Sequence, residues 1–332
     1  MRKIILTTLA ALFAASANQV HADTPPANAV PMSRTQVPGY FRIMVGQAEV
    51  TAIYDGWLSL PVKSYHSHTT IPIEELNALV ERSFMTIMPD GGVNTAVSAY
   101  IINTGRNLVL LDAGAGDSYG HDLGKLADNI RAAGYTPSQI DVIIPTHMHF
   151  DHFSGVTVGG RMLFPNATIY LANEEKQYWI DTPIDRIEAH QQKFVQMARD
   201  AAAPYLAAGR VKYYDLGSEI IPGFKAIPTQ GHTPGHGSIE FTSAGSKLLV
   251  WGDLMHNHAI QLPDPSVAAD FDVKPEAARA TRLRMFKEVA HSRTMIAGAH
   301  LPFPGIGHIR QESIGYSWIP VQYMPVFDNN KK

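Results

Sequence analysis

The stretch "IPTHMHFDHFSG" (residues 144–155) places three histidines and one aspartate within six positions, His147 to His152. The chain contains 15 histidines and no cysteine. Thiolate ligands and disulfides are therefore excluded, and any metal must be held by imidazole nitrogen and carboxylate oxygen. Zinc and related ions accept both kinds of ligand at about 2.0–2.2 Å. A lone histidine is usually structural, but a cluster this dense predicts a metal site.

The spacing within the cluster predicts two metal ions. His147 and His149 follow the short apolar strand "DVIIP", and residues two apart on a strand face the same side. Both imidazoles can then converge on one ion. Asp151 and His152 follow as the chain turns and can face a second site nearby. Four ligands packed so closely rarely serve one ion, so two adjacent ions are expected.

Further ligand candidates stand at the ends of three later strand-like segments. His232 lies in "QGHTPGHG", Asp253 in "WGD" and His300 in "GAH". Loops at the strand ends along one edge of an α/β sheet are where such folds place active sites.

Composition and charge describe an ordinary globular chain of 332 residues with 45% hydrophobic and 17% charged residues. The formal net charge is −3 and no long basic run is present. Nucleic-acid and anionic-membrane partners are therefore not expected. Residues 1–22 have the pattern of a signal peptide, with "MRK", an apolar core and "VHA" before a cleavage site after Ala22. "ASA" ending at Ala17 is a second candidate site, and an N-terminal anchor that stays attached is the alternative. We predict an exported protein, periplasmic or secreted, without membrane association after cleavage.

The rest of the chain alternates strand and helix patterns. Residues 23–38, "DTPPANAVPMSRTQVP", predict a proline-rich linker or N-terminal arm, and residues 39–332 one folded domain. Residues 96–114 predict two strands joined at "NTGRN". Residues 173–208 predict a helix-rich segment and residues 274–291 a helix, separated by strand patterns. This alternation indicates a layered α/β fold.

The motifs resemble the metallo-β-lactamase superfamily, whose signature H-x-H-x-D-H stands here as "HMHFDH". "DAGAG" at 112–116, "GHTPGH" at 231–236, "GD" at 252–253 and "AH" at 299–300 also match. The resemblance implies an αββα sandwich with a dinuclear site at one sheet edge. It implies that His147, His149 and His232 hold one metal, that Asp151, His152 and His300 hold the other, and that Asp253 and a hydroxide bridge them.

A narrower resemblance is to the methyl parathion hydrolase group and its exported lactonase relatives. It rests on "THMHFDH", "FPNATIY", "GHTPGH", "FPGIGHIR" and "GYSWIPVQY". It implies a homodimer that acts on a small lactone, aryl ester or phosphotriester. The two divalent ions are expected to be zinc, although manganese, iron, cobalt and cadmium suit the same ligands. The bridging hydroxide would attack the substrate, with Asp151 and Asp253 as catalytic carboxylates.

Several residues around the metals are also predicted. Asp112 is expected to orient a metal-binding imidazole. Tyr119, Trp179 and Phe194 lie in segments that resemble the substrate-pocket aromatics of the group, although core packing is an equal alternative for each. The histidine at 236 is not expected to bind metal. The remaining histidines considered are expected to be exposed or hydrogen-bonded: His66, His68, His121, His256, His258 and His308.

Two other functions stay open. An exported metallo-β-lactamase would share the fold and the compartment, but the subclass with a cysteine ligand is excluded because the chain has no cysteine. A metal-binding protein without turnover is the second alternative, and the complete set of seven ligands argues against it.

Overall fold

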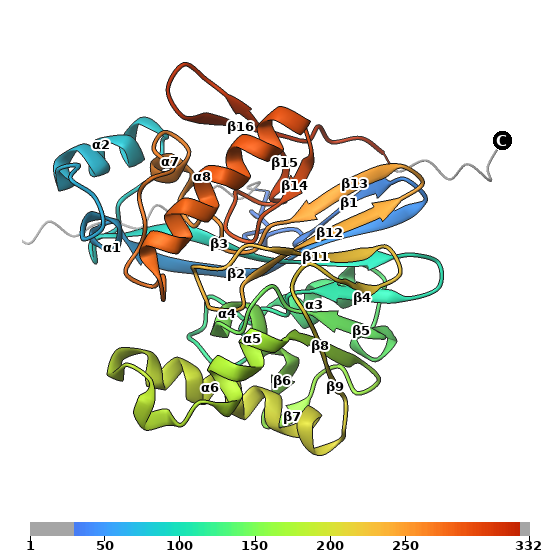
Figure 1. The fold of residues 1–332 in the computed structure, drawn as a ribbon. Coiled ribbons are helices and arrows are strands. Elements are labelled where there is room, and N and C mark those ends of the chain that lie inside the picture. The colour runs from blue at the N-terminus through green and yellow to red at the C-terminus, as the bar shows by residue number, and fades with distance from the viewer. Residues whose placement is uncertain (1–29, 326–332) are drawn as a thin grey trace, which may run out of the picture. The chain divides into compact units, whose positions relative to one another are not determined.

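Two seven-stranded sheets lie face to face in the computed structural model, which describes residues 30–325 (Figure 1). The first sheet has the strand order β1-β2-β3-β4-β5-β8-β9. It is antiparallel from β1 to β4 and parallel from β4 to β9. Its strands are β1 (Tyr40–Val45), β2 (Ala48–Pro61), β3 (Gly92–Asn103), β4 (Leu108–Leu111), β5 (Val142–Ile144), β8 (Thr168–Ala172) and β9 (Val211–Tyr214).

The second sheet runs in sequence order from β10 to β16. All neighbouring strands are antiparallel except β13 and β14, which are parallel and joined by a helix. Its strands are β10 (Glu219–Ile221), β11 (Phe224–Pro228), β12 (Gly237–Ser243), β13 (Ser246–Val250), β14 (Met295–Ala297), β15 (Ile306–Gln311) and β16 (Tyr316–Pro320). A separate small hairpin pairs β6 (Thr157–Val158) with β7 (Arg161–Met162).

The core between the sheets follows from strand alternation. Val109 and Leu111 of β4 face the second sheet, and Val250 of β13 belongs to the same buried cluster. Leu110 lies on the opposite face, with the helices. Both faces of the central strands are covered, so their sequences are continuous apolar runs, such as "LVLL" in β4.

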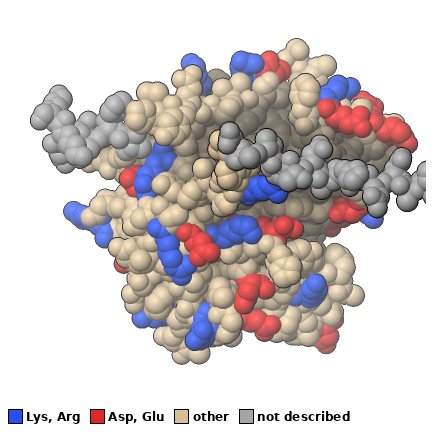
Figure 2. Space-filling model, turned by 180° about the vertical axis from the view of Figure 1, so that it is seen from behind, with Lys and Arg blue, Asp and Glu red and all other residues tan. Residues whose placement is uncertain are grey.

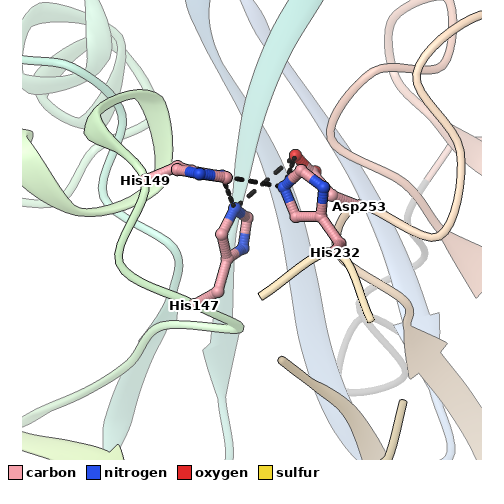
Figure 3. Close-up of side chains that lie close together, drawn as sticks. All are labelled: His147, His149, His232 and Asp253. Carbon is pink, nitrogen blue, oxygen red and sulfur yellow. Dashed lines mark hydrogen bonds and ion pairs between the residues drawn. The ribbon is translucent and has the colours of Figure 1, made fainter. Parts of the chain in front are cut away.

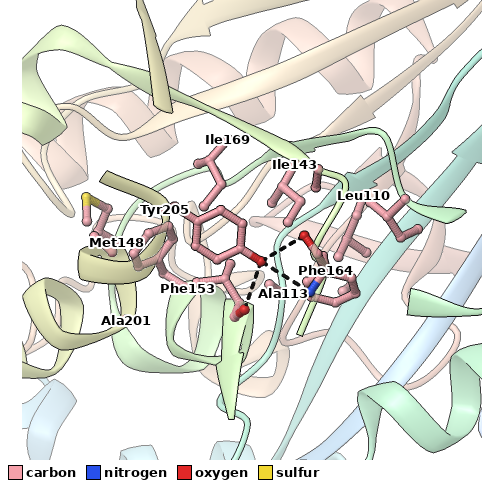
Figure 4. Close-up of a cluster of buried hydrophobic side chains, with 14 of the residues drawn as sticks. Leu110, Ala113, Ile143, Met148, Phe153, Phe164, Ile169, Ala201 and Tyr205 are labelled. Atoms are coloured by element: carbon pink, nitrogen blue, oxygen red, sulfur yellow. Dashed lines mark hydrogen bonds between the residues drawn. The ribbon is translucent and has the colours of Figure 1, made fainter. Parts of the chain in front are cut away.

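Helices cover the outer face of each sheet. On the first sheet, the outer core joins strand residues such as Ile143 to helix residues such as Val195, and Figure 4 shows the part of it around the Tyr205 ring. The Tyr205 hydroxyl donates to the carbonyl of Val156. The helices on this side are α3 (Leu126–Ala132), α4 (Phe150–Phe153), α5 (Asn173–Glu175) and α6 (Ala189–Ala207), with the short segments η1 (Pro137–Gln139), η2 (Ser154–Val156), the π-helical η3 (Lys176–Asp181) and η4 (Ile184–Arg186).

The second sheet is covered by α8 (Pro275–Ser292), whose Met285, Phe286 and Val289 pack against β13 and β14. Three shorter helices share a further buried cluster with residues at the ends of β2 and β3. They are α1 (Lys63–His66), α2 (Ile73–Arg82) and α7 (His258–Gln261). The layers are thus helix, sheet, sheet, helix, and the predicted αββα sandwich is confirmed.

Residues 38–325 fall within one compact unit, and residues 30–37 carry no helix or strand. The predicted signal peptide lies outside the described residues. Among the described residues, no helix is both long and apolar enough to cross a membrane. On the face seen in Figure 2, basic and acidic side chains are interspersed.

Candidate metal centre

The predicted ligands lie in segments that follow the carboxyl ends of four strands, with Asp151 and His152 in the short helix α4. His232 follows β11, Asp253 follows β13 and His300 follows β14. The backbone of His147 and His149 differs from the prediction that both lie on a strand. Strand β5 ends at Ile144, so His147 and His149 are not alternating residues of a strand. The loop after β5 bends at His147, and His149 is extended and directly precedes α4, which begins at Phe150. The two imidazoles nevertheless meet, with Nε2 of one facing Nδ1 of the other.

Three imidazoles and one carboxylate form the first cluster, drawn in Figure 3. The Nδ1 atom of His149 lies 3.0 Å from Nε2 of His147 and 2.7 Å from Nε2 of His232. The Oδ2 atom of Asp253 lies 3.2 Å from Nε2 of His232 and 3.6 Å from Nε2 of His147. The four side chains approach from two sides, the first two from the β5 loop and the others from the second sheet.

Asp151, His152 and His300 form the second cluster. Their facing atoms are Oδ2 of Asp151 and the Nε2 atoms of both histidines, which are 3.3 Å apart. The Oδ1 atom of Asp253 lies 3.0 Å from Nε2 of His152 and 3.2 Å from Nε2 of His300. Asp253 therefore presents one oxygen to each cluster.

The separations within both clusters fit divalent ions. Tetrahedral zinc with bonds of about 2.0–2.1 Å places its ligand atoms roughly 3.3 Å apart. The facing atoms here are separated by 2.7–3.6 Å. The Oδ1 atom of Asp253 is buried and accepts no hydrogen bond within the described chain. It lies within 3.2 Å of two imidazole nitrogens but without hydrogen-bond geometry, and a cation between these atoms is a partner that the arrangement suits. The donor set of nitrogen and oxygen atoms is one that zinc accepts.

Four of the five imidazoles are oriented through Nδ1, which leaves Nε2 for the clusters. Asp112, the predicted orienting residue, accepts from Nδ1 of His152 at 2.9 Å. The carbonyl of Ala96 accepts from Nδ1 of His300 at 2.8 Å. Nδ1 of His147 lies 3.1 Å from the Thr146 hydroxyl, which itself donates to Asp112. Outer partners of this kind fix the tautomer and the ring orientation of a metal ligand.

The fourth oriented imidazole has a partner that the sequence analysis missed. Asp272 is buried and accepts from Nδ1 of His232 at 2.8 Å. It lies 40 residues away from that histidine, in a segment with no recognisable motif. A single sequence therefore gave no signal for this pair.

Glu175 is a second residue that the sequence analysis missed. Its buried carboxylate accepts from the backbone N–H of Met148 at 2.8 Å, from that of Gly235 at 2.9 Å and from the Thr233 hydroxyl. It thereby connects the loop of His147 and His149 to the loop of His232. Burial raises the pKa of Glu175 to about 7, although all three hydrogen bonds oppose the shift.

Two histidines outside the ligand set contact Asp253. His236 was not expected to bind metal, and the structure places its Nε2 as the acceptor of the Asp253 backbone N–H at 2.9 Å. His256 donates from Nε2 to Oδ2 of Asp253 at 2.9 Å. It is buried and forms part of a third group with Asp253 and His300. Of its two expected environments, exposed or hydrogen-bonded, the structure shows the second.

The glycine before Asp253 has a clear geometric reason. Gly252 adopts a left-handed conformation with φ +59°. A Cβ atom there would lie 2.5 Å from Nε2 of His236 and 2.8 Å from Cβ of Thr146. Glycine at this position thus lets the backbone before Asp253 pass close to both His236 and Thr146.

The imidazoles of the two clusters differ in the direction of their pKa shifts. Burial, followed by neighbouring imidazoles, holds the pKa of His147 and of His149 well below the usual value, so both are neutral at pH 7. Burial would raise the pKa of Asp253, but His152, His300 and other imidazoles hold it well below its usual value. Burial lowers the pKa of His152, His232 and His300, but the neighbouring carboxylates outweigh it and raise each pKa above its usual value. Because imidazole binds a metal in its neutral form, metal binding would release protons from these three residues.

A cavity of about 170 Å³ opens above both clusters. His149, Asp151, His232, Asp253 and His300 form its polar side. Its other walls are mainly apolar and aromatic, formed by Leu58, Leu60, Tyr119, Phe150, Phe194 and Phe271. The Phe150 ring lies between Tyr119 and Phe194, with ring centroids 4.4 and 5.6 Å away. Such a cavity suits a small substrate with one polar reacting group and an apolar body.

The three predicted pocket aromatics take different places. Tyr119 and Phe194 line the cavity. Trp179 does not, because it is fully buried in the outer core of the first sheet. Its ring packs edge-to-face against His149, with centroids 5.1 Å apart. The structure therefore places Trp179 behind a cluster residue, where it supports that imidazole rather than facing the cavity.

Comparison with known proteins agrees with this geometry. Residues 92–292, more than half of the chain, match the family described as Metallo-beta-lactamase superfamily. The chain belongs to the metallo-β-lactamase superfamily. Within that superfamily it is a metallo-hydrolase with lactonase relatives.

Two solved structures and one curated protein illustrate its relatives. A hydrolase of the beta lactamase superfamily, AbOPH, is 36% identical, with 88% of this chain and 100% of that chain covered and a TM-score of 0.82. AidC, a dizinc quorum-quenching lactonase solved with N-hexanoyl-L-homoserine, is 26% identical, with 86% and 99% covered and a TM-score of 0.78. The N-acyl homoserine lactonase AiiA of Bacillus thuringiensis subsp. kurstaki is 24% identical over 235 residues, 64% of this chain and 84% of AiiA. The narrower resemblance to the methyl parathion hydrolase group stays a prediction.

Proposed function

We propose that the protein is a dinuclear metal-dependent hydrolase that opens lactones and aryl esters. The observation that carries this proposal is the position of Asp253. Its two oxygens face two separate clusters of ligand atoms, and both clusters lie at the floor of one apolar cavity. The dizinc lactonase among its relatives supports the same reading.

The residues have distinct roles in this proposal. His147, His149 and His232 would hold one ion, Asp151, His152 and His300 the other, and Asp253 both. When bound, two such ions lower the pKa of water and polarise a carbonyl oxygen. Burial would raise the pKa of Asp151, but His152 and His300 lower it to about 2. Its carboxylate faces the cavity in the ionised form, able to orient the attacking water.

The apolar walls indicate what the substrate carries beside its reacting carbonyl. Phe150, Phe194 and Phe271 present hydrocarbon surface around the cavity. Burying an apolar ring or acyl chain there is favourable by about 25 cal/mol per Å² of covered surface. Lactones with an alkyl or aryl substituent, including the N-acyl homoserine lactones of the relatives, fit this description.

The full chain, loaded with two equivalents of zinc, provides the test. The kcat/KM values for dihydrocoumarin, N-hexanoyl-homoserine lactone, methyl parathion and a chromogenic β-lactam are measured on one preparation. We expect the two lactones to be hydrolysed best. Faster turnover of methyl parathion would place the protein with phosphotriesterases, and faster turnover of the β-lactam with exported β-lactamases.

A His149→Ala variant is the control for contaminating activity. It removes one ligand of the first cluster and should abolish hydrolysis of every substrate. If wild-type protein binds zinc but hydrolyses none of the four, the non-catalytic metal-binding alternative is favoured. Activity that survives in the variant would contradict the proposed centre. We also propose export, which the presence of the protein in a periplasmic fraction would test.

A further inference from the structure

Arg282 is a fully buried charged residue that does not line the cavity. It belongs to α8, and its side chain has no exposed surface. The guanidinium donates to the carbonyls of Leu254, of Pro265 at 3.2 Å and of Val267 at 2.6 Å. A buried cation is strongly unfavourable unless it is paired, so its surroundings must explain why it is kept.

The carbonyls that Arg282 binds belong to one segment, residues 254–267, which starts directly after Asp253. The same segment carries His256, which contacts Asp253, and leads to Phe271 in the cavity wall. Arg282 thus fixes both the start and the far part of the chain that follows the bridging carboxylate.

The countercharge of Arg282 is Asp272. Its Oδ2 lies 3.7 Å from Nη2 of Arg282, which has no hydrogen-bond partner among the described residues. That Oδ2 also accepts from the backbone N–H of Ala269 at 3.0 Å. The other oxygen, Oδ1, accepts from Nδ1 of His232. Buried side-chain contacts therefore run from α8 to the first cluster, from Arg282 to Asp272 and from Asp272 to His232.

We propose that Arg282 is a positioning residue for the metal centre and acts through Asp272. The three carbonyl contacts hold the guanidinium in place, and its charge holds the Asp272 carboxylate. Asp272 in turn fixes the His232 ring with Nε2 toward the first cluster. This inference rests on the proposed function, since it requires that His232 binds metal. Arg282 is fully buried and does not line the cavity, so it is not assigned a direct catalytic role.

Zinc affinity, measured by competition with a chromogenic chelator, tests the proposal without relying on activity. The variants are Arg282→Met, Asp272→Asn and the double variant, in the full chain. Arg279→Met is the matched control, because Arg279 lies on the same helix and binds the carbonyls of Ser266 and His68. Loss of an outer partner typically weakens metal binding by about 10–100-fold.

We expect Arg282→Met to weaken one of the two zinc equivalents about tenfold or more, while Arg279→Met leaves both unchanged. Because Arg282 acts through Asp272, the double variant should bind zinc within about twofold of Asp272→Asn alone. The proposal would be overturned if the losses of zinc affinity in the two single variants multiplied in the double variant. It would also be overturned if Arg282→Met bound zinc as tightly as wild type. If zinc-free Arg282→Met does not fold, Arg282→Lys replaces it in the same cycle, with the same two readings. A wild-type chain that binds no zinc would instead refute the proposed function.

Discussion

At the scale of single residues, the site depends on carboxylates that do not themselves face the cavity. Asp112 adopts a left-handed backbone conformation with φ +60°. Its Oδ1 accepts from the Thr146 backbone N–H at 2.7 Å, while Oδ2 accepts from His152. Aspartate and asparagine tolerate this conformation better than most residues, so the position combines a backbone requirement with a requirement for two acceptor oxygens.

Asp112→Asn should therefore keep the fold but weaken metal binding. An amide offers one acceptor oxygen, so either Thr146 or His152 loses its partner. We expect zinc affinity to fall by about 10–100-fold, measured by chelator competition. Asp141→Asn is the control, since Asp141 caps the N–H of Leu108 away from both clusters. Equal affinity in the two variants would show that Asp112 does not orient a ligand.

At the scale of elements, the first cluster exists only if loops from two sheets are held together. The β5 loop supplies His147 and His149, and the β11 loop supplies His232. Glu175, at the end of α5, accepts hydrogen bonds from both loops. Glu175 therefore links the two loops. Among the described residues, no basic side chain forms an ion pair with its carboxylate.

Glu175→Gln should separate the two loops. One backbone N–H would face an amide N–H₂ group instead of an acceptor, and a buried unsatisfied donor costs about 1–3 kcal/mol. We expect the free energy of unfolding in urea to fall by roughly that amount and zinc affinity to fall with it. The exposed Glu74→Gln on α2 provides the comparison and should change neither. A variant as stable as wild type would refute the proposal that Glu175 links the two loops.

The strands and helices could be predicted from the sequence more completely than the buried contacts that hold their loops together. Strands and helices follow local apolar periodicity, so the sandwich could be inferred, and the seven ligand candidates could be found because they follow strand ends. Asp272, Glu175 and Arg282 could not be found, because each acquires its role only through contacts 10 to 60 residues away. Trp179 was identified as an aromatic of the site, but the sequence could not decide which side of His149 it occupies.

At the scale of the whole molecule, metal and fold should stabilise each other. The clusters gather side chains from both sheets, so ions bound there would bind the folded chain and not the unfolded one. A ligand at 100 times its Kd stabilises the folded state by about 2.7 kcal/mol. For a chain of this length that corresponds to an increase in Tm of about 4 °C.

Removing metal should therefore lower the thermal stability reversibly. We expect the Tm to fall by several degrees after treatment with a chelator, and to recover when zinc is added in excess over the chelator. Calcium added to the stripped protein should not restore it, because calcium prefers oxygen ligands and most of the ligands here are imidazoles. An unchanged Tm after complete metal removal would mean that the clusters do not bind ions in the folded protein.

The central claim is that two ions in the adjacent clusters carry out hydrolysis together. The most direct measurement is a titration of metal-free protein with zinc while hydrolysis of a lactone is followed. The shared Asp253 predicts that kcat reaches its maximum at two equivalents of zinc per chain and rises no further. Full activity at one equivalent, or no activity at any, would contradict a dinuclear hydrolase.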